Sequence, residues 1–200
     1  MSVQEQTKAL TIDPTALPSA HAVAYLTSLL RTIPDFPKPG IMFKDITPLL
    51  GDPRGLNMVL DLMAQPFIGA DIHHTVAMEA RGFIFGGALA ARLNNSFVPI
   101  RKPGKLPADV DEVSYSLEYG EGRLQMHKGS IAPGDKVLII DDLLATGGTA
   151  AASVQLVQAQ GGVVAAFVFV VELDFLKGAD KLRDLTASDV PVFSLIHIVD

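Results

Sequence analysis

The sequence predicts an α/β protein in which helices cover both faces of a central parallel β-sheet. Short, unbroken apolar runs alternate with segments whose apolar residues repeat at helical spacing. Strands of a parallel sheet that is buried on both faces have this composition. Glycine-containing turns directly follow two of the runs. The predicted strands are the four apolar runs Thr75–Met78, Phe97–Ile100, Val137–Ile140 and Val163–Val171.

The first fifty residues precede this alternating pattern. Residues 1–20 mix polar residues with prolines, and we expect an N-terminal arm there, followed by a single domain over residues 21–200. From Ser19, a plausible N-cap, apolar residues follow helical spacing. Residues 34–53 hold five of the 13 prolines. Because proline fixes φ and lacks an N–H group, we expect a packed loop there, without a regular helix or a central strand.

Three further helices are predicted, one before the first strand and two between strands. The first spans Leu56–Met63, and the second follows the turn EARGFIFGG and ends near Asn94–Asn95. The third runs from about Ala150 to Gln160, where two glycines stop it. This alternation completes the α/β pattern.

One polar segment interrupts the alternation between the second and third strands. Val113 and Tyr115 alternate with polar residues, as do Leu124 and Met126, and a glycine-containing turn separates the two pairs. This pattern predicts a β-hairpin. A hairpin that projects from an α/β core on polar arms is a candidate for a flexible lid, here over residues 103–128.

The overall composition limits the classes of function. The net charge of −6 and pI near 5.3 argue against a nucleic-acid partner. The absence of cysteine excludes a disulfide framework, a thiolate nucleophile and a cysteine metal site. No apolar run reaches the roughly 18 residues of a membrane helix, and no secretory signal is visible. We therefore expect a cytoplasmic protein without a membrane partner.

The segment KVLIIDDLLATGGTA places two aspartates and a glycine turn directly after an apolar strand. The turn Thr146–Thr149 would offer unobstructed backbone N–H groups, two hydroxyls and the positive end of a helix, which together can bind a phosphate. It is not an ATPase-type loop, since no Gly-Lys-Ser/Thr follows. Asp141 and Asp142 would repel a phosphate unless they bind hydroxyl groups, such as those of a ribose, or a cation.

Two points about this segment stay open at this stage. A helix cap without a ligand explains many such glycine turns. Side chains alternate along a strand, so Asp141 and Asp142 can both face a ligand only if the strand has already ended.

VLIIDDLLATGGTA resembles the phosphoribosyl-pyrophosphate (PRPP) signature of the type I phosphoribosyltransferases. Four more stretches narrow the resemblance to the branch that uses adenine: PDFPKPGIMFKDITPLL, EARGFIFG, IRKPGKLP with YSLEYG, and VELDFLKGADKL. Together they span roughly residues 34–182. The resemblance implies the type I fold with a small hood from residues 34–50 and the C-terminal region. It also implies transfer of the phosphoribosyl group of PRPP to adenine, giving AMP and pyrophosphate.

The same resemblance implies where PRPP binds. Asp141 and Asp142 would accept hydrogen bonds from the ribose hydroxyls and favour the positive charge that develops on the sugar. Mg²⁺ would be held by PRPP and water, without a direct protein ligand. The 5′-phosphate would bind Ala145, Thr146, Gly147, Gly148 and Thr149. The pyrophosphate would bind Arg81, Arg101, Lys102 and Lys105.

The resemblance also assigns the base and the lid. Phe43 and Leu173 would pack on the two faces of adenine, and backbone groups of Met42 and Lys44 would read its edge. Glu118 and Tyr119 would close over the site as catalytic lid residues. The turn at Glu79–Ala80, just before Arg81, would contain a cis peptide bond.

Two alternatives remain. A phosphoribosyltransferase for xanthine, hypoxanthine or guanine would share the PRPP site, but the hood sequence argues against it. A PRPP-sensing regulator without catalysis would tolerate loss of Glu118, and it would usually need an added DNA-binding domain and a basic face. We expect a homodimer, as in the family that the chain resembles.

Overall fold

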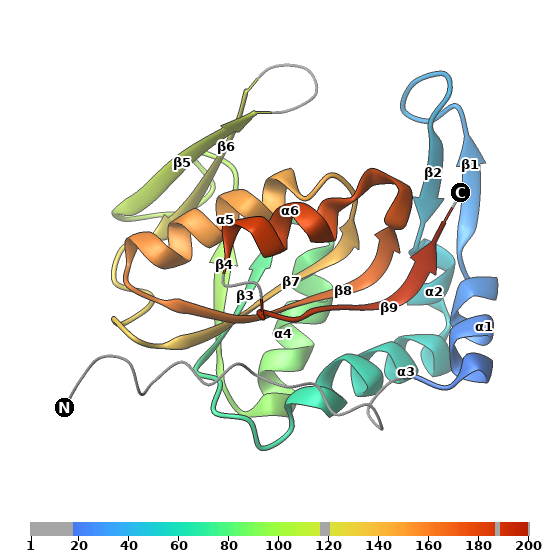
Figure 1. The fold of residues 1–200 in the computed structure, drawn as a ribbon, viewed down its shortest axis with the longest axis horizontal. Helices are drawn as coiled ribbons and strands as arrows, with labels where there is room; N and C mark the ends of the chain where they lie inside the picture. Colours follow the sequence, from blue (N-terminus) through green and yellow to red (C-terminus); the bar gives the residue numbers. More distant parts are fainter. Residues whose placement is uncertain (1–17, 117–120, 187–188, 200) are drawn as a thin grey trace.

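The computed structural model describes residues 18–116, 121–186 and 189–199. Its centre is a parallel sheet in the strand order β4-β3-β7-β8-β9 (Figure 1). The predicted α/β fold with a central parallel sheet is therefore confirmed. The strands are β3 (His74–Met78), β4 (Ser96–Ile100), β7 (Lys136–Leu144), β8 (Val163–Leu173) and β9 (Val192–Ile198).

Helices cover both faces of this sheet. Buried side chains of α5 and α6 pack on one face, and those of α1, α3 and α4 pack on the other (Figure 1). None of the helices in the described part of the chain is long and apolar enough to cross a bilayer. The bounds are α1 (Ala20–Ser28), α3 (Pro53–Ala64), α4 (Gly82–Leu93), α5 (Gly148–Ala159) and α6 (Gly178–Leu185).

Strand β8 shows why the sheet needs unbroken apolar sequence. It lies between β7 and β9, so both of its edges are paired, and helices cover both of its faces. Phe167 and Phe169 are buried on the α5 side, whereas Val168 and Val170 are buried on the α4 side. Each such side chain contributes about 1.5–3 kcal/mol by leaving water.

The order of the strands creates a switch point between β3 and β7. From β3 the chain moves outward to β4, and it later returns to the other side of β3 as β7. Connections therefore leave the carboxyl ends of these two neighbours in opposite directions. Ligands of open α/β sheets bind at such points.

The proline-rich stretch is more regular than the sequence predicted. An antiparallel pair, β1 (Arg31–Pro34) and β2 (Met42–Asp45), is followed by the short helix α2 (Thr47–Gly51). The expectation of a loop without a regular helix was therefore wrong, whereas neither β1 nor β2 belongs to the central sheet, as expected. Three of the five prolines are tolerated because they end β1 or lie in the first turns of α2 and α3, where no ladder or helix N–H is needed. Pro37 and Pro39 lie in the turn between β1 and β2.

Asp45 fastens this β1–β2 pair, which we call the hood hairpin, to α2. Its carboxylate accepts hydrogen bonds from the Thr47 backbone N–H at 2.9 Å and from Arg31 Nε at 3.0 Å. These two interactions, that of Thr47 first, lower the pKa of Asp45 to about 2. The carboxylate is therefore ionised at neutral pH, and the hairpin is held by an ion pair and backbone bonds together.

The predicted lid is a hairpin of β5 (Val110–Ser116) and β6 (Glu121–His127), so the hairpin prediction is confirmed. Leu124 and Met126 of β6 are buried against the core beside α5. We call β5–β6 the lid hairpin. Its turn, residues 117–120, lies outside the described residues.

The other element predictions are confirmed with shifts in their bounds. Ser19 caps α1 by accepting a hydrogen bond from Ala22 N, and α4 ends at Asn94 in the left-handed conformation. Strand β7 continues four residues beyond the predicted end. The sequence did not predict β9, because Ser194 and His197 break its apolar run, and it did not predict α6. Short 3₁₀ turns η3 (Gln65–Phe67) and η4 (Asp174–Leu176) complete the described elements.

The N-terminal arm stays a prediction. Residues 1–17 lie outside the described part of the chain, and α1 begins at Ala20. The boundary between arm and domain is therefore not tested.

Candidate active site

A cleft of about 790 Å³ opens at the switch point, between the ends of β3 and β7 and the lid hairpin. One wall is formed by the turn after β3, another by the loop after β4, and a third by β5 and β6. The floor is the end of β7. The lining residues are Glu79, Ala80, Arg81, Lys102, Pro103, Tyr115, Gly122, Arg123, Leu124, Asp141, Asp142 and Thr149.

Both predicted aspartates line this cleft although both lie within β7. The expectation that this requires the strand to end before them was wrong. Asp141 does not stand straight out from the strand, because its Oδ1 accepts a hydrogen bond from the backbone N–H of Asp142 at 2.9 Å. The same oxygen would lie 2.7 Å from a Cβ at Gly82, so a side chain at the start of α4 would have to displace the Asp141 carboxylate. The bent side chain brings the Asp141 carboxylate to the cleft that Asp142 also lines.

Arg81 is the cation that faces these carboxylates. Its Nε lies 2.8 Å from Asp142 Oδ2, and its Cζ lies 5.6 Å from the centre of the Phe43 ring. The guanidinium therefore connects the end of β7 with the hood hairpin. Within the described residues, Asp142 Oδ2 is buried and accepts no hydrogen bond of good geometry, so this contact is an ion pair alone.

The pKa values of both carboxyls are raised. Burial is the main cause for Asp141, and the neighbouring charge of Asp142 adds to it. Burial also raises the pKa of Asp142, although Arg81 opposes the shift. Two crowded, poorly hydrated carboxylates gain from a bound cation or from hydroxyl donors.

The turn Ala145–Thr149 forms a hollow of about 80 Å³ at the start of α5. Gly147 has φ +73, and helix α5 begins at the next residue, so backbone N–H groups at the positive helix end surround the hollow. Asp141 and Thr149 line both this hollow and the large cleft, which makes the two spaces neighbours. The sequence prediction of an anion site in this turn fits the geometry.

A glycine that the sequence analysis did not single out supports this turn. A Cβ at Gly178, the first residue of α6, would lie 2.2 Å from Ala145 O. A Cβ at Gly147 would lie 2.9 Å from Gly178 O. The backbone of the turn and the backbone at the start of α6 are in contact, so neither Gly147 nor Gly178 has room for a side chain.

The four predicted pyrophosphate cations divide into two pairs. Arg81 and Lys102 line the cleft, whereas Arg101 and Lys105 are not among its lining residues in the described structure. Arg101 donates to Glu79 Oε2 at 2.5 Å and to Lys105 O at 2.9 Å. It thereby ties the loop after β4 to the turn after β3.

Glu79 is the acceptor that organises these loops. Burial raises its pKa, but hydrogen bonds from Arg101 and from the Lys102 backbone N–H outweigh burial and hold the pKa below its usual value. The peptide bond Glu79–Ala80 is cis, as the resemblance implied. The ionised Glu79 thus fixes the turn that carries Arg81.

The predicted base-binding residues lie on two elements. Phe43 is half-buried in the hood hairpin. Phe36 packs edge-on against it, with 5.1 Å between the ring centroids. Met42 is 57% exposed, and Lys44 Nζ donates to Thr32 Oγ1 at 3.0 Å. Leu173 ends β8 and packs partly buried on the α4 side of the core.

The predicted lid residues, one unpredicted cleft residue and a separate polar cluster complete the comparison with the sequence. Glu118 and Tyr119 lie outside the described residues. Arg123 lines the cleft and was not predicted. On β6 it alternates with the apolar residues Leu124 and Met126, and such polar positions of a hairpin are usually solvated. A separate cluster of Glu172, Asp174 and His197 joins the ends of β8 and β9, with His197 Nδ1 2.9 Å from Asp174 Oδ1.

Comparisons with known proteins identify the family of the chain. A family model described as phosphoribosyl transferase domain matches residues 61–199. The chain is 64% identical over 182 residues to an adenine phosphoribosyltransferase of Sorangium cellulosum, with 91% of both chains covered.

Solved structures give the same result. The adenine phosphoribosyltransferase of Thermoanaerobacter pseudethanolicus matches with a TM-score of 0.83 and 46% identity, over 88% of this chain and 99% of that chain. The enzyme of Saccharomyces cerevisiae, crystallised with adenine and an imino-altritol bisphosphate, matches with a TM-score of 0.80 and 37% identity. That match covers 89% of this chain and 100% of the yeast chain.

The chain belongs to the phosphoribosyltransferases, because the family model matches more than half of it. Within them it belongs to the adenine phosphoribosyltransferases. It is a purine-salvage enzyme that transfers the 5-phosphoribosyl group of PRPP to adenine and yields AMP and pyrophosphate.

Proposed function

We propose that this transfer takes place in the cleft, with PRPP lying across the end of β7. One observation carries the proposal: Asp141 lines both the hollow of Ala145–Thr149 and the cleft, where Asp142 lies with the cations Arg81 and Lys102. A molecule with a phosphate at one end, a diphosphate at the other and hydroxyls between them matches this order. PRPP has these groups in this order.

The chemistry of each group follows from its place. The turn Ala145–Thr149 holds the 5′-phosphate on backbone N–H groups. Asp141 and Asp142 accept hydrogen bonds from the ribose hydroxyls, and their charge stabilises the cationic sugar as the C1′–oxygen bond to pyrophosphate breaks and the bond to adenine forms. Arg81 and Lys102 stabilise the departing diphosphate, with Arg101 and Lys105 as further predicted ligands.

Mg²⁺ is the proposed cofactor, and the residues present fit it. Asp142 Oδ2 is a buried carboxylate oxygen that accepts no hydrogen bond among the described residues, beside a second carboxylate. Mg²⁺ prefers such hard oxygen groups and keeps most of its waters. It would be held by PRPP and by waters that Asp141 and Asp142 bind, and it would neutralise diphosphate charge.

Removal of divalent cations is expected to abolish measurable AMP formation, since the diphosphate would then leave without charge compensation beyond the side chains. The assay compares the enzyme with excess EDTA, with EDTA followed by excess Mg²⁺, and untreated. Restored activity supports the proposal. Undiminished activity in EDTA would contradict it.

Adenine is proposed to stack on Phe43, with Leu173 on its other face and backbone groups of Met42 and Lys44 at its edge. In the free protein the Arg81 guanidinium lies near the Phe43 ring, so the ring already accepts a flat cationic group. An aromatic face suited to guanidinium also suits a purine.

Phe43→Ala is expected to raise KM for adenine about 10–100-fold, because base–aromatic stacking contributes about 1–3 kcal/mol. KM for PRPP should change little, and it serves as the internal control in steady-state assays. An unchanged KM for adenine would place the base elsewhere.

Base selectivity tests the edge-reading groups directly. Backbone donor and acceptor groups that fit adenine meet the reversed pattern of a 6-oxo purine and would remain unpaired. Purified protein with PRPP and Mg²⁺ should therefore form AMP, and form no IMP, GMP or XMP from hypoxanthine, guanine or xanthine. Formation of one of these would remove the proposed roles of Met42 and Lys44 while leaving the PRPP site intact.

Three further proposals concern the lid residues, the oligomeric state and the cellular compartment. Glu118 is proposed to handle the purine proton and Tyr119 to pack near the sugar, which Glu118→Gln and Tyr119→Phe test through kcat. We propose a homodimer, supported by exposed apolar side chains such as Ile68 and Phe175, and tested by the mass in solution. The cytoplasm is the proposed compartment, because the phosphorylated substrates do not cross membranes unaided.

A further inference from the structure

We propose that Arg123 on β6 is a further ligand of the diphosphate of PRPP, which it takes in exchange for its ion pair with Glu112. The inference rests on the proposed placement of the diphosphate in the cleft. Among the described residues, the cations that line the cleft are Arg81, Lys102 and Arg123. The first two follow strands of the central sheet, and the third comes from the lid hairpin.

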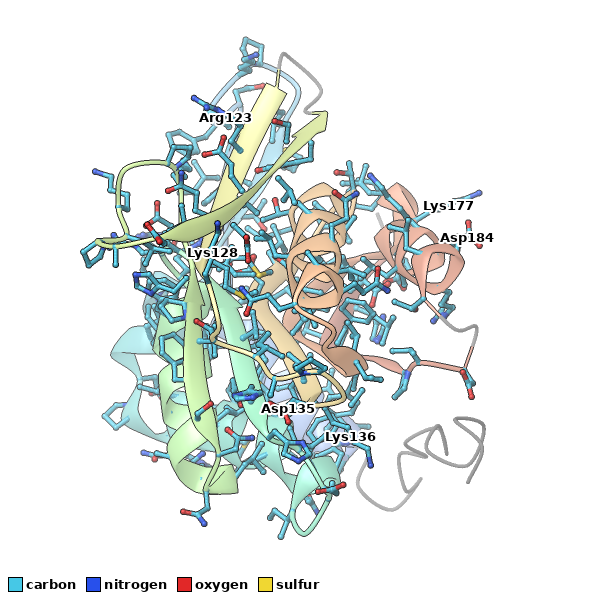
Figure 2. The ribbon with its side chains drawn as sticks, turned by 90° about the vertical axis from the view of Figure 1, so that its left-hand side faces the viewer. Arg123, Lys128, Asp135, Lys136, Lys177 and Asp184 are labelled. Atoms are coloured by element: carbon cyan, nitrogen blue, oxygen red, sulfur yellow. The ribbon has the colours of Figure 1, made fainter. Side chains whose placement is uncertain are left out.

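The face of the hairpin that carries Arg123 has no role in the core. Leu124 and Met126 on the opposite face are buried against α5. Arg123 instead has a side chain that is 57% exposed, and it forms an ion pair with Glu112, with Nη1 and Oε1 3.1 Å apart. Figure 2 shows Arg123 at the upper end of the hairpin, far from Asp135 and Lys136 at the opposite end of the molecule.

Hydrogen bonds fix β6 beside the loop that carries Lys102. Gln125 and Arg101 exchange backbone hydrogen bonds of 2.9 and 2.7 Å. Gln125 Oε1 also accepts a hydrogen bond from Gly104 N at 3.1 Å. Arg123 lies two residues from this junction on the same face of β6 as Gln125. The guanidinium and Lys102 therefore reach the cleft from neighbouring pieces of backbone.

Glu112 holds Arg123 weakly enough for the exchange. Glu112 Oε2 also accepts a hydrogen bond from Gln125 Nε2 at 2.5 Å, so Glu112 keeps a donor when Arg123 leaves. An exposed ion pair contributes little to stability. A diphosphate carries several charges and offers paired oxygens that match the guanidinium fork.

The test compares Arg123→Gln, Arg123→Lys, Glu112→Gln and Lys102→Gln by steady-state kinetics with both substrates, and by calorimetric titration with pyrophosphate. Arg123→Gln should raise KM for PRPP about tenfold, the loss expected for one charge-assisted hydrogen bond, and leave KM for adenine unchanged. Arg123→Lys should recover part of the loss. Glu112→Gln should leave KM for PRPP equal or lower, because it frees Arg123.

Three outcomes would overturn the proposal. If Lys102→Gln raises KM for PRPP and Arg123→Gln does not, the diphosphate lies in the cleft but Arg123 does not bind it. If Arg123→Gln and Glu112→Gln raise it equally, the ion pair only supports the hairpin. If neither Lys102→Gln nor Arg123→Gln changes KM or pyrophosphate affinity, the placement of the diphosphate itself fails. Melting temperatures of all four variants confirm that they are folded.

Discussion

Replacing Gly178 with alanine is expected to lower kcat/KM for PRPP about 100-fold, the effect of misplacing a binding group by about 1 Å. The added Cβ would lie 2.2 Å from Ala145 O and 3.1 Å from Gly147 N. Both atoms are backbone, so the strain cannot be relieved by a side-chain rotation. The start of α6 or the turn Ala145–Thr149, the proposed phosphate site, must move.

The measurement is steady-state kinetics for PRPP together with titration of the free enzyme with AMP, which shares the 5′-phosphate. Gly87→Ala is the matched control, because Gly87 is also helical and no atom lies within 4 Å of its added Cβ. It should retain activity and gain slightly in helix stability. Normal PRPP kinetics in Gly178→Ala would mean that this contact does not set the turn.

Gly178 also marks the boundary of what the sequence could predict. Strand, aspartates and anion-binding turn are consecutive residues, so their chemistry is visible in one short segment. Gly178 contacts the same turn from α6, about thirty residues later. Gly178 must be a glycine only because the backbone of α6 packs directly on the backbone of the turn Ala145–Thr149, and this contact is not visible in the local sequence.

Arg123 and Arg101 show the same limit of sequence-based prediction. Arg123 lines the cleft but was not predicted to, whereas Arg101 was predicted to and, in the described part of the chain, does not. An arginine beside alternating residues of a hairpin is most simply a solvated side chain, yet the fold brings Arg123 to the cleft wall. Arg101 lies in a loop rich in cations, yet it is held by Glu79 from another strand end. Charge counting along the chain cannot separate these cases, because the partner of each arginine is distant in sequence.

The two aspartates show where a correct pattern gave an incomplete geometry. Two-residue alternation holds along β7 up to Ile140, and it predicted opposite directions for Asp141 and Asp142. The hydrogen bond from Asp142 N to Asp141 Oδ1 overrides it locally. A carboxylate can turn back onto its own backbone, whereas the apolar side chains earlier in the strand cannot.

Asp141→Asn is expected to lower kcat about 100–1000-fold, as removal of a preorganised charge from a transition state does. The same change should make the protein more stable at neutral pH. Burial and the charge of Asp142 raise the pKa of Asp141 in the folded state. Ionised Asp141 is therefore a source of strain that the asparagine lacks, while the amide oxygen can still accept the hydrogen bond from Asp142 N.

The sign of the pH dependence distinguishes this explanation from a general gain in packing. The pKa of Asp141 in the folded protein lies above its unfolded value of about 3.9. At pH values between these two pKa values, the folded protein binds more protons than the unfolded chain does. The stability of the wild type therefore falls as pH rises through this range. The asparagine side chain of the variant does not titrate. The advantage of the variant should be absent below about pH 4, appear as pH rises, and stay constant above the folded pKa.

Thermal unfolding at several pH values measures this difference. A gain of about 1 kcal/mol would raise Tm at neutral pH by about 2–4 °C in a chain of this size. Asp184→Asn on the exposed side of α6 is the control for the loss of an exposed carboxylate, and it should change Tm at neutral pH far less than Asp141→Asn does. A variant at Asp141 that melts below the wild type at neutral pH would show that the carboxylate stabilises the free enzyme. A gain that persists at low pH would show that its charge is not the cause. The expected result, lower activity with higher stability, would mean that the free enzyme holds a destabilising charge at the proposed ribose site.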